Sequence, residues 1–284
     1  MGVQQQEEQE SNAMHSRTEL SIGCIGCGNM GGAILAGIAE RARHTLYGYD
    51  LDRERMRPLI AKGVRSVADM TSLVRGSTLI IIALKPHLIE SVLREIKPHL
   101  KPEILLLSVA AGISLKRLQT AVDSVCPVVR VMPNTPALVG SGVFALCLDD
   151  PALKPEQKKT VTELFGAIGT TIELPDEKFN AFTAVFGAGP AYVFYMMQSL
   201  TQAAVTLGFT KTEAVRLVNA LFTGSTKLAQ ASESSHTELQ DMVCSPGGVT
   251  IYGINSMDRR GIRGHIVDAV LAAYMRGLDI EKNV

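Results

Sequence analysis

Six residues near the start of the sequence constrain the fold more than any others. The motif GCGNMG, at 26–31, directly follows a short apolar run and opens a segment of helical periodicity. In such a strand–turn–helix unit, Gly26 permits the tight turn, Gly28 lets the backbone approach a pyrophosphate, and Gly31 allows close packing. The helix N-terminus adds free N–H groups and partial positive charge. The motif therefore predicts a dinucleotide site, with a glycine-rich turn that binds nothing as the alternative.

Apolar runs alternate with helical segments over the first part of the chain. Continuous apolar runs such as LIIIAL and ILLLSVA are typical of strands that are buried on both faces. Strands that alternate with helices predict an α/β fold with a parallel, doubly wound sheet. We expect strands at 20–27, 45–50, 79–84, 104–110 and 128–132, and helices at 29–42, 52–62, 67–75 and 87–100. The region 137–174 adds strands and one helix, and its last residues close the sheet.

The pattern changes after Pro175, where helical segments follow one another without strands. We expect these helices at 176–186, 190–207, 211–232, 236–243 and 249–278. The chain is therefore divided into an α/β domain at 18–175 and an all-helical domain at 176–284. Two of the helices are apolar on more than one face, which predicts a subunit interface; a compact monomeric bundle is the alternative. The polar segment 1–17 is expected to be a tag and a disordered leader, with Met14 as the natural start.

Charge and cysteine content exclude several classes of protein. The 28 basic and 28 acidic residues cancel, and without a basic block we expect no nucleic acid as partner. No apolar run approaches the roughly 18 residues of a membrane span, and no secretory signal is present. Five scattered cysteines do not form a disulfide pattern, which indicates a reducing compartment, the cytoplasm. The six histidines are dispersed without metal-ligand spacing, so we expect no metal site. The C-x-x-C of Cys24 and Cys27 is interpreted as packing residues, with a redox pair as the alternative.

Asp50 ends the strand that follows the glycine motif. A carboxylate at this place accepts hydrogen bonds from both ribose hydroxyls of an adenosine and repels a 2′-phosphate, which favours NADH. Arg53 and Arg55 follow closely and would suit a 2′-phosphate, so NADPH stays open; solvated helix residues are the alternative for both arginines.

Further candidates lie in loops after strands and before helices. Residues 83–86 and 109–112 follow two central strands, at the sheet edge where doubly wound folds bind ligands. Lys85 either reaches a ribose or is a solvated turn residue. In the helical domain, Gly247 and Gly248 allow successive N–H groups to converge on an anion, and Thr250 adds a hydroxyl. This loop is either a carboxylate cradle or a plain helix cap, and the glycines at 187–189 serve either a site or helix packing.

Several separated motifs, in this order, make the chain resemble the pyrroline-5-carboxylate reductases. They are GCGNMG at 26–31, ALKPH at 83–87, SVAAGIS at 108–114, VRVMPNTPALVG at 129–140, GAGPAYVF at 187–194 and DMVCSPGGVTIYGI at 241–254. The resemblance covers about residues 20 to 278 and implies a Rossmann domain followed by a helical dimerisation domain. It implies that NAD(P)H is bound through Ile25, Gly26, Gly28, Asn29, Met30, Ala83, Lys85, Pro86, Ala110 and Ala111. The glycine spacing adds Gly31 to these residues, and the end of the next strand adds Asp50.

The resemblance also implies a substrate and a reaction. The substrate is the cyclic imine 1-pyrroline-5-carboxylate, reduced to L-proline in the last step of proline biosynthesis. Its carboxylate is expected on the backbone N–H groups of Gly247, Gly248 and Val249, with Ser245 shaping the loop. Thr250 matches the threonine that binds the ring nitrogen, and Glu233 matches a substrate-contacting glutamate.

The family pattern implies a homodimer through the helical domain, and many members assemble further into decamers. Phe186 and Ala188 replace two serines that members usually carry, which is the clearest departure from the pattern. Two alternative functions follow. One is a reductase of another cyclic imine acid, and the other is a catalytically weak, dinucleotide-binding regulatory protein.

Overall fold

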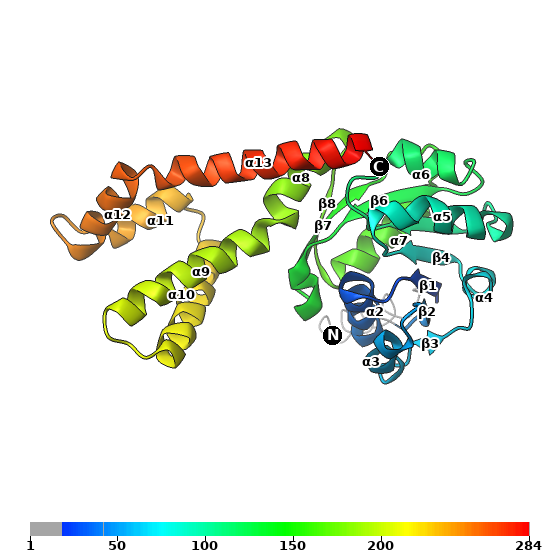
Figure 1. Ribbon diagram of the computed structural model, residues 1–284, viewed down its shortest axis with the longest axis horizontal. Helices are drawn as coiled ribbons and strands as arrows, with labels where there is room; N and C mark the ends of the chain where they lie inside the picture. Colours follow the sequence, from blue (N-terminus) through cyan, green and yellow to red (C-terminus); the bar gives the residue numbers. More distant parts are fainter. Residues whose placement is uncertain (1–18, 42, 284) are drawn as a thin grey trace, which may run out of the picture. The chain divides into compact units, whose positions relative to one another are not determined.

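A mixed sheet organises the first part of the chain (Figure 1). The structure is a computed structural model that describes residues 19–41 and 43–283, so the leader expected at 1–17 lies outside the described residues. The described strands form one sheet in the order β3-β2-β1-β4-β5-β6-β7-β8. Their bounds are β1 (Ser21–Ile25), β2 (Thr45–Tyr49), β3 (Arg65–Ser66), β4 (Leu79–Ile82), β5 (Leu105–Ser108), β6 (Val128–Met132), β7 (Gly142–Cys147) and β8 (Gly169–Glu173).

The first six strands run parallel, which confirms the predicted doubly wound sheet. The strand order reverses between β1 and β4, and this reversal places a crevice at their carboxyl ends. β7 pairs antiparallel with β6, and β8 pairs parallel with β7. The sheet is therefore not parallel throughout, because its last two strands run the other way.

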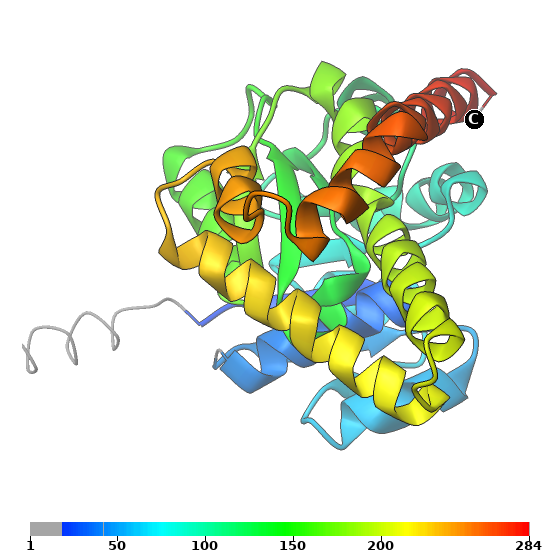
Figure 2. The ribbon, with the colours of Figure 1, turned by 90° about the vertical axis from the view of Figure 1, so that its left-hand side faces the viewer.

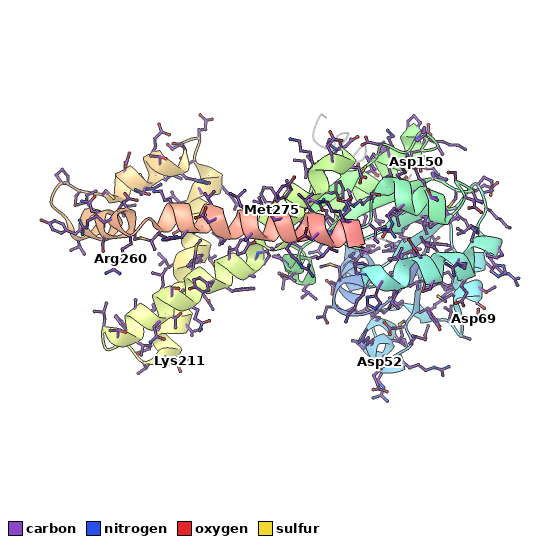
Figure 3. The ribbon with its side chains drawn as sticks, turned by 45° about the horizontal axis from the view of Figure 1, so that its top comes forward. Asp52, Asp69, Asp150, Lys211, Arg260 and Met275 are labelled. Atoms are coloured by element: carbon purple, nitrogen blue, oxygen red, sulfur yellow. The ribbon has the colours of Figure 1, made fainter. Side chains whose placement is uncertain are left out.

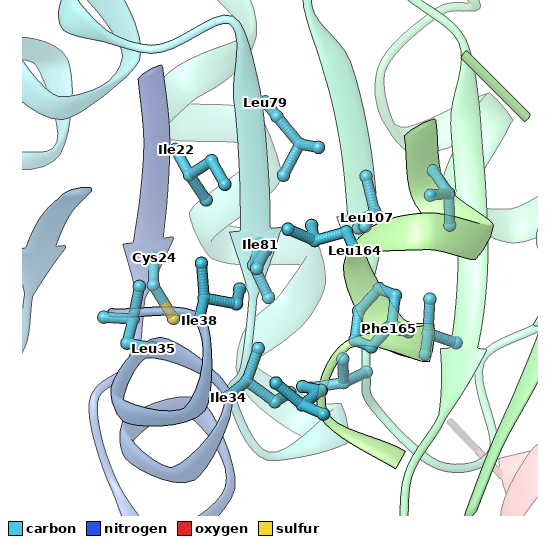
Figure 4. Packing of buried hydrophobic residues seen from close by; sticks show 14 of the residues in the cluster. Ile22, Cys24, Ile34, Leu35, Ile38, Leu79, Ile81, Leu107, Leu164 and Phe165 are labelled. Atoms are coloured by element: carbon cyan, nitrogen blue, oxygen red, sulfur yellow. The ribbon is translucent and has the colours of Figure 1, made fainter. Parts of the chain in front are cut away.

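Helices cover both faces of the sheet, and the central strands alternate their side chains between two cores, the first of which is shown in Figure 4. Ile81 packs with the first core and Ile82 with the second. The first core lies under α2 (Asn29–Arg41) and α7 (Pro155–Gly166), and the second under α4 (Met70–Gly76), α5 (Pro86–Ile96) and α6 (Leu115–Ala121). Burying each such side chain stabilises the fold by roughly 1.5–3 kcal/mol. This two-sided burial is why these strands have continuous apolar sequences.

Some expected elements differ from the structure. The helix expected at 52–62 is a short turn, η1 (Arg53–Met56), followed by α3 (Arg57–Ile60). Neither β3 nor α6 was expected from the sequence. The single helix expected at 249–278 is wrong, because it is divided into α12 (Val249–Arg259) and α13 (Ile262–Asn283). Gly261 separates them with φ +65°, a left-handed conformation that ends a helix.

A second compact unit extends from Ala184 to Gly277, whereas the described residues from Leu278 onward belong to the first unit. The boundary expected at 175 stays a prediction. Between β8 and this unit lie η4 (Asp176–Lys178), α8 (Phe179–Phe182) and a π-helical turn, η5 (Thr183–Gly187). The unit contains α9 (Gly189–Thr206), α10 (Lys211–Ala231), α11 (His236–Val243), α12 and most of α13.

Three helices of the second unit, α9, α10 and α11, begin and end within a residue of the bounds that the sequence predicts. Pro190 lies in the first turn of α9, and Gly208 follows its end with φ +100°. Thr210 and Glu213 then form a capping box that starts α10. The resulting hairpin of α9 and α10 can be followed in green and yellow (Figure 2).

Apolar side chains remain exposed over much of the second unit. No residue of α9 is buried in the single chain. Met275 on α13, labelled in Figure 3, belongs to the same exposed set. The larger members are Phe194, Tyr195, Leu207, Leu221, Met242, Val249, Tyr252, Val267, Leu271 and Met275. Apolar exposure on this scale is typical of a surface that another subunit covers. No helix in the described part of the chain is long and apolar enough to cross a membrane.

Candidate functional site

The predicted cofactor residues meet at one edge of the sheet. β2, β1, β4 and β5 are parallel neighbours, so the loops that follow them share their carboxyl ends. Ala83 donates its backbone N–H to Ile25 O at 2.9 Å, which joins the β4 loop to the glycine loop. Gly26 donates to Tyr49 O at 2.9 Å and so joins the same loop to β2.

The glycine loop has the close approaches that its motif predicts. Gly26 has φ +91°, a conformation that side chains rarely adopt. A Cβ on Gly31 would clash with Gly26 O and lie 2.9 Å from Ala83 Cβ, so glycine is required for α2 to pack on β1. Side chains at these positions would fill the cradle over the N-terminus of α2, and their absence leaves room for a pyrophosphate. The loop therefore fits a dinucleotide.

The Asp50 carboxylate is already bonded to the backbone on both of its oxygens. Oδ2 accepts from the Cys27 N–H at 2.7 Å, and Oδ1 accepts from the Asp52 N–H at 2.9 Å. Its side chain is only 8% exposed. Asp50 thus links the glycine loop to the turn after β2, a structural role that the sequence analysis did not predict.

Arg55, rather than Arg53, is the arginine at this site. Its Nη1 lies 3.6 Å from Asp50 Oδ2, and its Nε lies 3.4 Å from a carboxylate oxygen of Asp52, labelled in Figure 3. The same Nη1 lies 3.2 Å from the position that a Cβ on Gly28 would take. Because Arg55 is half exposed, these ion pairs stabilise the fold by about 1 kcal/mol at most.

The loops after β4 and β5 complete this edge of the sheet. Lys85 is exposed just before α5, and Pro86 lies in the first turn of that helix, so both interpretations of Lys85 stay open. Ala110 is buried, and its N–H approaches Ser108 Oγ at 3.4 Å. Ala111 is half-buried beside it. Small side chains here keep the edge open.

Residues 245–250 form a turn that leads into α12 in the second unit. Gly247 has φ +68°, and Gly248 donates its N–H to Ser245 O at 3.0 Å. Gly248 precedes α12, and no side chain caps the first N–H groups of that helix. The structure therefore brings Ser245, Gly247, Gly248, Val249 and Thr250 together at a helix N-terminus with uncapped donors, as an anion cradle requires.

Glu233 lies apart in the connection between α10 and α11, and it is exposed. Among the described residues, no hydrogen bond or ion pair joins it to the 245–250 turn. Its assignment rests on the family pattern alone.

The two cysteines of the C-x-x-C motif are buried beneath the glycine loop. Hydrogen bonding to Cys27, reinforced by burial, raises the pKa of the Cys24 thiol well above its usual range. A redox-active cysteine needs a lowered pKa, so this environment favours the packing interpretation. No cluster of three metal-ligating side chains exists within 19–41 and 43–283.

A cavity of about 490 Å³ lies elsewhere, between α5 and α6. Half of its lining residues are cationic, namely Arg94, Lys97, Lys116 and Arg117, and the lining also contains Glu90. It shares no residue with the sites described above.

Comparison with known proteins identifies the family. Residues 176–280 match the family model described as pyrroline-5-carboxylate reductase dimerisation, and residues 21–112 match that of NADP oxidoreductase coenzyme F420-dependent. The pyrroline-5-carboxylate reductase of Methanosarcina acetivorans is 34% identical over 92% of this chain and 98% of its own length. The chain belongs to the pyrroline-5-carboxylate reductases.

Other members of this reductase family agree over nearly the whole chain. Pyrroline-5-carboxylate reductase 3 of Xenopus laevis is 33% identical over 94% of this chain and 98% of its own. The Plasmodium falciparum pyrroline carboxylate reductase, solved with NADP bound, superposes with a TM-score of 0.82 at 30% identity, covering 92% and 98% of the two chains. The Coxiella burnetii enzyme gives 0.83 at 28% identity, covering 93% and 99%.

One group of residues near these reductase motifs escaped the sequence analysis. Arg130 lies buried within β6 and forms an ion pair of 2.8 Å with Asp176. The sequence did carry a signal, since a charged residue inside the apolar run VVRVM needs a buried partner. The distant Asp176 was not identifiable as that partner from sequence.

Proposed function

We propose that this chain transfers hydride from NAD(P)H to the imine carbon of 1-pyrroline-5-carboxylate and so forms L-proline. The observation that carries the proposal is the pairing, in one member of this reductase family, of a fitted glycine cradle with an uncapped anion-binding turn. The first suits a dinucleotide, and the second suits the carboxylate of a small acid.

At the cofactor site, the residues of the chain act by positioning the bound dinucleotide. The glycine loop and the N-terminus of α2 hold the pyrophosphate of the dinucleotide, and Asp50 fixes that loop through Cys27. Space for the nicotinamide ribose is left at the sheet edge by four small or compact residues, Ala83, Pro86, Ala110 and Ala111. When bound, the reduced nicotinamide supplies the hydride. The chain itself contributes a fixed geometry, which is a large share of the catalysis of a reaction between two bound partners.

The substrate end uses donors and needs no strong acid. We assign the carboxylate to the N–H groups of Gly247, Gly248 and Val249. The Gly248 N–H also donates to Ser245 O at 3.0 Å, so it would be shared between the two acceptors, and Ser245 shapes the turn through this bond. Thr250 directs its hydroxyl to the ring nitrogen of the substrate. The hydroxyl stabilises the changing charge on that nitrogen as the imine becomes an amine. Solvent supplies the proton near neutral pH, and we assign Glu233 to substrate contact on the family pattern.

NADH is the preferred cofactor in this proposal. The Asp50 carboxylate, next to the glycine loop, supports it because a 2′-phosphate would be repelled there. Arg55 weakens that repulsion, since its guanidinium lies 3.6 Å from the same carboxylate. We therefore expect NADPH to be accepted, though with a lower kcat/KM.

The dimerisation region supports association through the second unit, and we propose a homodimer, with a decamer built from such dimers as the alternative. Buried, unpaired cysteines support the cytoplasm as the compartment.

The deciding experiment follows NADH and NADPH oxidation in parallel with 1-pyrroline-5-carboxylate, and identifies the product. Proline formation with a higher kcat/KM for NADH supports the proposal. Turnover restricted to a six-membered imine acid would mean that this acid, and not 1-pyrroline-5-carboxylate, is the substrate. Tight NADH binding without turnover of either imine would mean a regulatory binding protein, with Phe186 and Ala188 as the first residues to revert to serine.

A further inference from the structure

The loop that follows β5 is held by residues from much later in the chain. Gly112 lies in this loop with φ +73°, and a Cβ there would lie 2.8 Å from Ile280 Cγ2 near the end of α13. Three residues further on, Leu115 donates its backbone N–H to Asp176 Oδ2 at 3.0 Å. The loop is thus fixed at two points, just beyond Ala110 and Ala111.

Both holding segments are themselves anchored. Asp176 Oδ1 accepts from Arg130 Nη1 at 2.8 Å, and the Arg130 guanidinium lies 4.5 Å from the centre of the Phe179 ring. The Nε and Nη2 atoms of Arg130 are buried and have no hydrogen-bond partner among residues 19–41 and 43–283, so Asp176 is the acceptor on which this buried cation depends.

The end of α13 is held as well, because Asn180 on α8 donates its Nδ2 to Glu281 Oε2. Asp176, Asn180, Ile280 and Glu281 thus form one unit, here called the clasp. The clasp is built where the chain leaves the first compact unit and where it returns to it.

We propose that the clasp positions the cofactor loop, with Asp176 and Ile280 as its positioning residues. They touch neither cofactor nor substrate. They fix Gly112 and Leu115, and through them the backbone of Ala110 and Ala111, against which the nicotinamide ribose is expected to bind. This inference rests on the cofactor site of the proposed function.

The glycine at position 112 is needed for the contact between the loop and the clasp. The left-handed backbone turns the loop toward α13, and the missing side chain lets Ile280 make direct contact. Ile280 therefore packs on the backbone of the loop, and its shortening would free the loop without removing any charge.

The test compares Ile280→Ala and Asp176→Asn with two matched controls, Lys282→Ala and Glu177→Gln, which alter exposed neighbours. The dissociation constant of NADH is measured by fluorescence titration of the full chain, together with KM, kcat and the thermal midpoint. We expect NADH to bind roughly tenfold more weakly in both clasp variants, with the imine KM nearly unchanged. Ile280→Val should restore most of the affinity.

Unchanged NADH affinity in a folded Ile280→Ala protein would overturn the inference, as would equal weakening in Lys282→Ala. If Asp176→Asn does not fold because Arg130 loses its charged partner, the Ile280 series decides alone. NADH affinity that depends on the clasp in a protein that reduces no imine would refute the proposed function and leave this inference standing.

Discussion

Asp50 combines two tasks that a single substitution can separate. Its carboxylate fixes the glycine loop through the Cys27 N–H at 2.7 Å, and its charge disfavours a 2′-phosphate. An asparagine can still accept from the Cys27 N–H with its single amide oxygen, but it loses the bond from the Asp52 N–H and carries no charge. Asp50→Asn should therefore raise the ratio of kcat/KM for NADPH to that for NADH by about tenfold, the effect of roughly 1.4 kcal/mol.

The matched control for this change is Asp52→Asn. Asp52 also pairs with Arg55, but its side chain is exposed and accepts no hydrogen bond from the glycine loop. Its cofactor ratio should stay near that of the parent protein. If both variants gave the parent ratio, Asp50 would have no contact with the ribose.

Thr250 carries the one side-chain hydroxyl of the 245–250 turn that we assign to chemistry. Valine has nearly the same shape but cannot bind the ring nitrogen. Thr250→Val should lower kcat by roughly 10²–10³-fold, the usual effect of losing a donor aimed at developing charge. The NADH dissociation constant should stay unchanged, because Thr250 lies in the second unit and the glycine loop lies in the first.

Steady-state kinetics and NADH titration of the same preparation test this role. Thr237→Val on α11, an exposed threonine outside the turn, is the control for loss of a hydroxyl. Normal turnover by Thr250→Val would show that the hydroxyl has no catalytic role.

At the scale of strands and helices, the pKa values of two cysteine thiols indicate how tightly the sheet and its helices are packed. Burial raises the pKa of Cys126 and of Cys147 to about 12. Both thiols therefore stay protonated in the folded protein at pH 8–10, whereas unfolded thiols ionise near pH 8.5. We expect a disulfide reagent to label the half-buried Cys244 alone in the native protein, and all five cysteines after unfolding.

The raised pKa values of these two thiols determine how the free energy of unfolding changes with pH. The folded state retains these protons above the pH at which the unfolded chain loses them, so the free energy of unfolding falls as pH rises from about 9 toward 12. Urea midpoints at pH 8 and pH 10.5 measure the loss. Cys244→Ser is the labelling control, and rapid native labelling of any thiol in this variant would contradict the packing.

Elements fixed by local pattern were predictable, and those fixed by tertiary contact were not. β4 and β5 are continuous apolar runs because both of their faces are buried, and the sequence predicts them for that reason. β3 has two residues, too few to carry a pattern. In the site, the glycine loop follows from spacing, but the bond between Asp50 and Cys27 joins residues that only the folded sheet brings together.

The whole molecule presents more apolar surface on its second unit than a single chain can bury. Leu221 on α10 and Leu271 on α13 are each more than half exposed, at 54% and 53%. Covering each leucine contributes roughly 1.5–3 kcal/mol, so a few such contacts distributed over both copies are enough to hold a dimer.

Charge on this surface should therefore separate the subunits. Combining Leu221→Glu with Leu271→Glu places desolvated carboxylates in the interface, and we expect the mass measured by light scattering to fall toward the 30.5 kDa of one chain. The parent protein should also show a thermal midpoint that rises with protein concentration, because association stabilises the folded state by mass action. Lys227→Glu, an exposed polar site on α10, is the control for added negative charge. A double variant that keeps the parent mass would place the subunit contact on another face of the helices.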